Sequence, residues 1–305
     1  MYINCHTGFS FQYGTLSPKA LFEEARRCGI HTLALTEINN TASYLEMLRL
    51  IEENKSLSNG LTKYGKVPHD LHLAVGIEFR NENEVCFIAL AKNNQGFETM
   101  NRFLSACHRE GRKIPLRAPD WEHIFVIYPL GKIEADQLRA HEYVGIGPHE
   151  LNTYARHPLR ETLPDKFVLL HPVTFLPPET VKEKISGKVK TVYRGFNTHR
   201  LLRCIANNML LSKLPEHFQA RKEEFMQPRQ EVEKKCAAFP ELISNADILL
   251  SQCSFYCEMD EDKNKKSISG SVQSDTDYLR AETEKGYLLR YGTDRQVWNN
   301  HIEKE

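Results

Sequence analysis

Seven short apolar runs, separated by stretches with helical character, occupy the first 175 residues and constrain the fold more than any other feature. Ser17-Pro18, between the first two runs, is an N-cap followed by proline at the first helical position, and Gly29 ends that helix. Strands that alternate with helices predict an α/β protein whose mainly parallel sheet closes into a distorted barrel of seven β/α units. The apolar runs lie at 1–5, 31–36, 71–79, 85–91, 123–130, 142–147 and 166–175.

Two further features complete the predicted organisation. The polar stretch 80–84 between the third and fourth runs predicts a hairpin or another tight connection. The β character fades after residues 176–185, and helical patterns then dominate. We therefore expect a barrel domain over 1–195, a helical region over 196–257 and a charged, Ser/Gly-rich flexible linker or loop over 258–275. Residues 276–305 begin with another helix and end without a new core, which predicts further sequence beyond Glu305.

The composition counts against several classes of protein. Forty Lys and Arg balance forty Asp and Glu, and a chain that encloses a nucleic-acid duplex alone would normally have a basic excess. The sequence contains no signal peptide, and no apolar run approaches the roughly 18 residues of a membrane span. We therefore expect a cytoplasmic protein with no membrane association.

The eight cysteines are scattered without C-x-x-C spacing, which indicates reduced thiols. Cys253 and Cys257 are one helical turn apart, and this spacing suits either half of a zinc site or ordinary packing. The cysteines are at positions 5, 28, 86, 107, 204, 236, 253 and 257.

Several potential metal ligands follow the predicted strands. His6, Glu37, Glu78 and His171 each lie at the carboxyl end of an apolar run, and Cys86 lies within or beside another. The carboxyl ends of barrel strands open onto one face, where active sites form. The sequence therefore predicts a polar cleft that collects imidazole and carboxylate groups.

Each of these residues also has an ordinary structural explanation. Glu37 precedes Asn39 and is placed as a carboxylate that caps the next helix. Glu78 can pair with Arg80, and His171, which precedes a proline, can bond a loop carbonyl. Both interpretations stay open on the sequence alone.

The segment "NCHTGFSFQYGTLSPKALFEEARRCGIHTLALTEINN" resembles the opening of the polymerase-and-histidinol-phosphatase (PHP) domain that begins the alpha subunit of bacterial DNA polymerase III. The family pattern is H-x-H-[ST]-x-x-S, a helix, and then A-[IL]-T-D-H-[GN]. The likeness continues through "GIEFR", "FVLLHPVTFL" and "HRLLRCIANNMLLSKLP", and "YLRAETEKGYLLRYG" resembles the first helix of the polymerase palm. It is weakest over 55–70 and 178–196. The resemblance implies a PHP barrel over 1–195, a helical junction, and the start of a palm over 276–305.

The resemblance implies a metal site of which this sequence keeps only part. The second histidine of H-x-H falls on His6, the aspartate of T-D-H on Glu37, and a later glutamate on Glu78. A family histidine falls on Cys86, and His171 is a further candidate. Four positions are degenerate relative to the family pattern: Asn4, Ile38, Pro172 and Thr174.

These departures change the chemistry that the resemblance implies. A centre of this type holds two or three divalent cations and needs many nitrogen and oxygen ligands. Isoleucine and proline supply none. We therefore expect no cofactor, or at most one weakly bound Zn or Mn ion, in a degenerate metal site.

The resemblance suggests an N-terminal fragment of a DNA-directed DNA polymerase, a nucleotidyltransferase of DNA replication. The polymerase active site and its Mg would lie downstream, so the fragment itself is not expected to be catalytic. Its partners would be the rest of the polymerase chain, a proofreading exonuclease subunit, and DNA and the replisome through the full-length protein. The alternative is a metal-dependent phosphoesterase with 3′–5′ exonuclease or phosphatase activity, and a third possibility is an unrelated α/β barrel.

Overall fold

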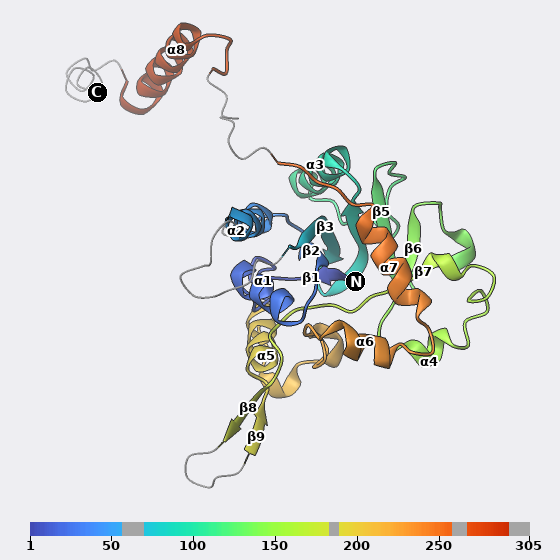
Figure 1. The fold of residues 1–305 in the computed structure, drawn as a ribbon. Coiled ribbons are helices and arrows are strands. Elements are labelled where there is room, and N and C mark those ends of the chain that lie inside the picture. Colours follow the sequence, from blue (N-terminus) through green and yellow to red (C-terminus); the bar gives the residue numbers. More distant parts are fainter. Residues whose placement is uncertain (57–69, 183–188, 258–266, 293–305) are drawn as a thin grey trace. The chain divides into compact units, whose positions relative to one another are not determined.

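A computed structural model describes residues 1–56, 70–182, 189–257 and 267–292 of the 305-residue chain (Figure 1). The chain divides into two compact units, Met1–Tyr256 and Cys257–Glu305. The first unit contains the barrel and the helices that follow it, and the predicted boundary at 195/196 stays a prediction.

The main sheet has seven strands in sequence order, as the α/β prediction requires. All neighbouring pairs are parallel except those of β4, which is antiparallel to β3 and β5. The predicted hairpin at 80–84 is therefore confirmed. A parallel bridge between Cys5 and Val173 joins β1 to the chain just after β7 and closes the sheet into a barrel. The strands are β1 Tyr2–Cys5, β2 Thr32–Ile38, β3 His72–Asn81, β4 Glu84–Ala91, β5 Ile124–Pro129, β6 Glu142–Ile146 and β7 Phe167–Leu169.

The helices of the first unit begin and end at recognisable caps. The Ser17 side chain accepts the Ala20 N–H at the start of α1, and Asn93 accepts the Gly96 N–H at the start of α3. Gly111 ends α3 in the left-handed conformation. The helices are α1 Pro18–Arg27, α2 Tyr44–Ser56, α3 Asn94–Glu110, α4 Leu151–Tyr154, α5 Arg194–Ala206, α6 Arg229–Lys235 and α7 Glu241–Ser251, with short 3-10 turns at Ala135–Gln137, Pro164–Lys166, Leu211–Lys213 and Glu216–Phe218.

Alternate residues of the strands belong to different cores. Ile3, Ala34 and Ala74 belong to one cluster with apolar residues of α7, whereas Leu33 and Leu35 pack with α1 and α2. Contacts of α7 place it at the end where the parallel strands begin. Asn245 Nδ2 donates to Phe167 O at 2.8 Å, and Asp247 pairs with the chain's N-terminal ammonium at 2.9 Å. The opposite end, where the strands finish, carries the polar residues.

The structure departs from the sequence prediction in three places. Strand β7 is only three residues long, because the chain beyond Leu169 makes a single bridge and no regular ladder. A two-stranded sheet of β8 (Glu179–Lys182) and β9 (Val189–Val192) lies where we expected the β character to fade. In the second unit, α8 spans Val272–Tyr291 and begins inside the predicted linker 258–275.

Parts of the predictions lie outside the described residues. Residues 258–266 of the predicted linker and 293–305 of the predicted palm segment are among them. The cysteines at 5, 28, 86, 107, 204, 236 and 253 are buried and form no disulfide. None of the helices in the described ranges is both long and apolar enough to span a bilayer.

Candidate functional site

A small polar cavity of about 190 Å³ lies at the carboxyl ends of the barrel strands. We call it the central cavity. His6 follows β1, Glu78 and Arg80 lie two residues apart on β3, and Pro172 follows β7. Because residues two apart on a strand share a face, β3 directs both of its charged side chains into the same space. Of the five residues that the sequence predicts for a polar cleft, His6 and Glu78 line this cavity.

The Glu78 carboxylate is the centre of a buried hydrogen-bond network. Its Oε2 accepts a hydrogen bond from Asn4 Nδ2 at 2.7 Å and lies 3.2 Å from His6 Nε2. Its Oε1 accepts the Nε–H of Arg80 in an ion pair. The two side chains of this pair are only 2% and 9% exposed. Both carboxylate oxygens of Glu78 therefore contact neighbouring side chains.

The electrostatics of this pair favour its charged form. Burial alone would raise the pKa of Glu78, but the Arg80 guanidinium and then His6 outweigh burial and hold the pKa well below its usual range. Burial opposes the charge of Arg80 as well, and the facing Glu78 carboxylate raises the pKa of Arg80 above its usual value. The cavity therefore contains a fixed cation and a fixed anion.

Aromatic and cationic side chains from the loop after β1 and from α5 enclose the pair. The Arg80 guanidinium carbon lies 4.2 Å from the ring centroid of Tyr13, and that of Arg203 lies at 5.4 Å. The His199 ring meets Tyr13 edge-on, with centroids 4.7 Å apart. Arg203 also donates to Gln12 O, which fastens α5 to this loop.

Glu37 lies outside the central cavity and organises the neighbouring loops. It accepts the backbone N–H of Thr7 at 3.1–3.2 Å and the hydroxyls of Thr7, Ser10 and Ser43. Ser43 directly precedes α2, so the carboxylate joins the loop after β1 to the approach to that helix. This arrangement resembles the capping role that the sequence allowed for Glu37.

Cys86 and His171, both candidate ligands, do not line the central cavity. Cys86 is the extra residue of a β-bulge, because Phe79 pairs with Phe87 and Arg80 with Val85. It packs in the apolar cluster beneath α3, where burial raises the pKa of its thiol. His171 Nε2 lies 3.2 Å from Glu223 O, the loop-carbonyl contact that the sequence allowed, and burial lowers its pKa to about 4.

The degenerate positions have structural contacts. Asn4 Oδ1 accepts the Thr36 hydroxyl at 2.7 Å, and the Thr174 hydroxyl donates to Glu224 at 3.1 Å and lies 3.3 Å from His6 Nδ1. Ile38 packs against a small cluster that includes Tyr13. Pro172 lines the cavity with its apolar ring.

The residues at the cavity do not fit a multinuclear metal centre. Within the described ranges, no three His, Cys, Asp or Glu side chains come together as a metal-binding group. Glu78 is committed to three neighbours, and one of them is a guanidinium. A divalent ion at this carboxylate would meet the charge of Arg80 at short range, where the interior dielectric screens repulsion weakly.

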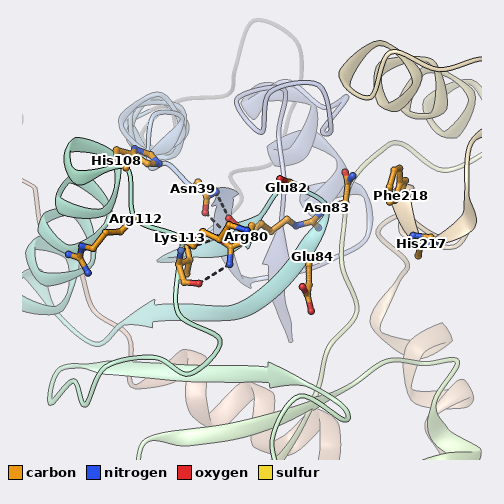
Figure 2. Close-up of a pocket in the computed structure, with 13 residues that line it drawn as sticks. Asn39, Arg80, Glu82, Asn83, Glu84, His108, Arg112, Lys113, His217 and Phe218 are labelled. Atoms are coloured by element: carbon orange, nitrogen blue, oxygen red, sulfur yellow. Dashed lines mark hydrogen bonds between the residues drawn. The ribbon is translucent and has the colours of Figure 1, made fainter.

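A larger pocket of about 700 Å³ adjoins the central cavity (Figure 2). It shares Arg80, Asn83 and His217 with that cavity. Figure 2 shows the Arg80 backbone tied to Asn39 on one side of this pocket, with hydrogen bonds of 2.8 and 2.9 Å. The end of α3 and the loop after it also line this pocket, with His108, Arg112 and Lys113.

Sequence reasoning missed most of the residues that surround Glu78. Arg80 was considered only as the ordinary partner of Glu78, although its position two residues later on a strand already indicated a shared face. Tyr13, Arg203 and Glu224 come from loops and from α5, and no local sequence pattern places such residues at the barrel mouth.

Three comparisons with known proteins bear on this site. Residues 3–135 match the family model of the PHP domain. The chain is 29% identical over 111 residues to an error-prone DNA polymerase of Pseudomonas savastanoi pv. phaseolicola, and 30% identical over 111 residues to one of Pseudomonas syringae pv. syringae. Each match covers 36% of this chain and 9% of the relative, so the aligned part is less than a tenth of these polymerases.

A solved structure, described provisionally as a metal-dependent phosphoesterase of Bifidobacterium adolescentis, aligns with a TM-score of 0.28 and 14% identity. This alignment covers 82% of our chain and 73% of that one. A score this low supports no conclusion about activity.

Proposed function

We propose that this chain, whose residues 3–135 match the PHP-domain model, belongs to a bacterial DNA polymerase of the DNA polymerase III alpha type and that the domain is structural rather than catalytic. The matches to error-prone DNA polymerases support the first part of the proposal. The observation that carries the second part is the buried Glu78–Arg80 pair, in which a protein cation neutralises the carboxylate.

The chemistry of phosphate-ester cleavage explains why this pair matters. Such cleavage needs a cation that activates water and whose ligands are held in place by further hydrogen bonds. Glu78 already binds Asn4, His6 and Arg80, while Cys86 lies under α3. Two of the expected metal ligands, His6 and Glu78, are therefore engaged in hydrogen bonds with each other and their neighbours, and a third, Cys86, lies in an apolar core.

The same residues support a structural role. The network joins residues at the carboxyl end of the barrel, and α7 contacts the other end, which supports a barrel that keeps its fold without metal. We propose that the surface of this barrel contacts the rest of the polymerase chain and receives a proofreading exonuclease subunit. Specific interfaces of this kind typically bury about 1,200–2,000 Å².

Purified protein is expected to contain less than one equivalent of zinc, manganese or iron per chain, because Arg80 neutralises the carboxylate that such an ion would need. Elemental analysis after dialysis against metal-free buffer checks this. Arg80→Met, which releases the carboxylate, serves as the comparison. Two or more equivalents in the unmodified protein would show that the site is a working centre.

The chain is also expected to leave a labelled 3′-recessed primer and a phosphomonoester intact in the presence of Zn or Mn. The alternative, a phosphoesterase with 3′–5′ exonuclease or phosphatase activity, predicts turnover that depends on the cavity. His6→Gln removes a cavity residue, and Arg102→Gln, on the exposed surface of α3, is the matched control. Turnover that is lost with His6→Gln and kept with Arg102→Gln would contradict the structural role.

A further inference from the structure

A second pocket, of about 470 Å³, lies beside the central cavity at the carboxyl ends of β5, β6 and β7. We call it the lateral pocket. Pro129, Leu170 and Pro172 form an apolar wall that it shares with the central cavity. Its volume falls within the roughly 300–1,000 Å³ of pockets that hold small molecules. None of the roles considered above uses this space.

One buried polar atom at the lateral pocket has no partner. His171 lines the pocket, and its Nδ1 forms no hydrogen bond with the described residues. The other ring nitrogen, Nε2, lies 3.2 Å from Glu223 O, and the ring packs edge-on against Tyr2 with centroids 5.4 Å apart. Buried polar atoms are nearly always satisfied, so an unpaired ring nitrogen at a pocket indicates a polar partner from outside.

Two cationic side chains also line the lateral pocket. Neither Arg221 nor Lys235 forms an ion pair with a carboxylate among the described residues, and the Lys235 ammonium donates only to Gln227 Oε1 at 2.7 Å. Two of the nearby carboxylates are held by backbone N–H groups. Glu150 accepts from Gly147 N at 2.7 Å and Glu224 from Arg221 N at 2.8 Å. The remaining carboxylate, Glu223, is exposed.

We propose that the lateral pocket binds a small organic anion, whose phosphate or carboxylate group is held by Arg221 and Lys235. The apolar part of the ligand packs on the proline and leucine wall, and a polar group of the ligand meets His171 Nδ1. Guanidinium and ammonium groups are the usual partners of such anions. This assignment is independent of the proposed function, since it does not involve the Glu78–Arg80 pair.

Calorimetric titration of the whole chain with matched probes tests this assignment. Phenyl phosphate and benzoate share an aromatic body and differ in the anionic group, and benzyl alcohol lacks the charge. We expect at least one anion to bind about tenfold or more tightly than benzyl alcohol, the effect of one charge-assisted contact. The anion that binds more tightly shows whether the pocket prefers a phosphate or a carboxylate group. Equal binding of all three probes, or no heat with either anion, would overturn the proposal.

Variants on α6 and in the loop before it locate the binding site. Lys235→Gln is expected to lower the affinity for the tighter-binding anion about tenfold or more, and Arg221→Gln is expected to lower it as well. Lys234→Gln is the control, because this neighbouring lysine is exposed, pairs with Glu231 and does not line the pocket. All three side chains lie at the surface, so the fold is kept. Equal losses with Lys235→Gln and Lys234→Gln would place the anion elsewhere and refute the assignment.

Discussion

Replacement of Arg80 by methionine is expected to lower the free energy of unfolding by about 3–5 kcal/mol, the usual cost of removing one partner of a buried ion pair. Methionine keeps much of the side-chain volume but removes the charge. The Glu78 carboxylate then stays in a site that is 2% exposed with no compensating cation. Urea unfolding followed by circular dichroism at pH 7 measures the change.

Two further variants make this result specific. Arg102→Met removes a cation of similar chemistry from an exposed pair with Glu98, and it should change stability by about 0.5 kcal/mol or less. Glu78→Gln combined with Arg80→Met removes both charges and should be more stable than Arg80→Met alone. If Arg80→Met costs no more than Arg102→Met, the pair does not support the fold.

The same pair predicts a dependence on pH. Burial would raise the pKa of Glu78, yet Arg80 and His6 hold it below its unfolded value. A depressed folded pKa stabilises the protein fully above the unfolded value of about 4.3 and loses that contribution as the pH falls through the folded pKa. In Arg80→Met, burial raises the pKa of Glu78, so the difference in unfolding free energy between the two proteins should be largest near neutral pH and shrink steadily as the pH falls toward and below about 4.

Leu35→Ala is expected to cost about 2–5 kcal/mol, because it removes buried methyl groups and leaves a cavity. Leu35 is 2% exposed and belongs to the cluster between the sheet, α1 and α2. Leu45→Ala is the matched control, since Leu45 lies on α2 and is 55% exposed. Denaturant titration of both variants, with and without a metal chelator, measures the loss. A chelator should change neither curve if packing, rather than metal, holds the barrel.

In the full-length polymerase, the proposed structural role predicts that Leu35→Ala weakens both the enzyme and its capture of the proofreading subunit in a pull-down. Leu45→Ala should leave both intact. Normal activity and normal capture after the Leu35 change would show that the barrel does not perform this role.

Most of the sheet could be predicted from sequence, because period and apolar content are local properties. The runs at 71–79 and 123–130 became β3 and β5, and the polar tip at 80–84 became a hairpin. The strands β8 and β9 were missed because each has only four residues, in which valine is mixed with Glu, Thr and Lys, so neither carries a clear apolar run. The short β7 was overestimated because an apolar run does not show where hydrogen bonding stops.

The site could be predicted only in part, because a sequence shows which residues follow a strand but not which way they face. His6 and Glu78 do meet at the barrel mouth. Cys86 does not, since one extra residue in β4 turns it to the outer face, and an insertion of this kind has no sequence mark. Arg203 reaches the site from α5 across more than a hundred residues, a contact that only the folded chain defines.

The closure of the barrel has a consequence for how the protein exchanges its amide hydrogens with solvent. Two backbone hydrogen bonds close the seam, from Val173 N to Asn4 O at 2.9 Å and from His6 N to Val173 O at 2.8 Å. Asn4 and His6 are also the residues that contact Glu78. We therefore expect that separation of β1 from the last segment would expose the amides of His6 and Val173 to exchange and disturb the contacts of Glu78 with Asn4 and His6 together. The amide hydrogens of His6 and Val173 should therefore exchange at similar rates, and both rates should rise when the Glu78–Arg80 pair is removed.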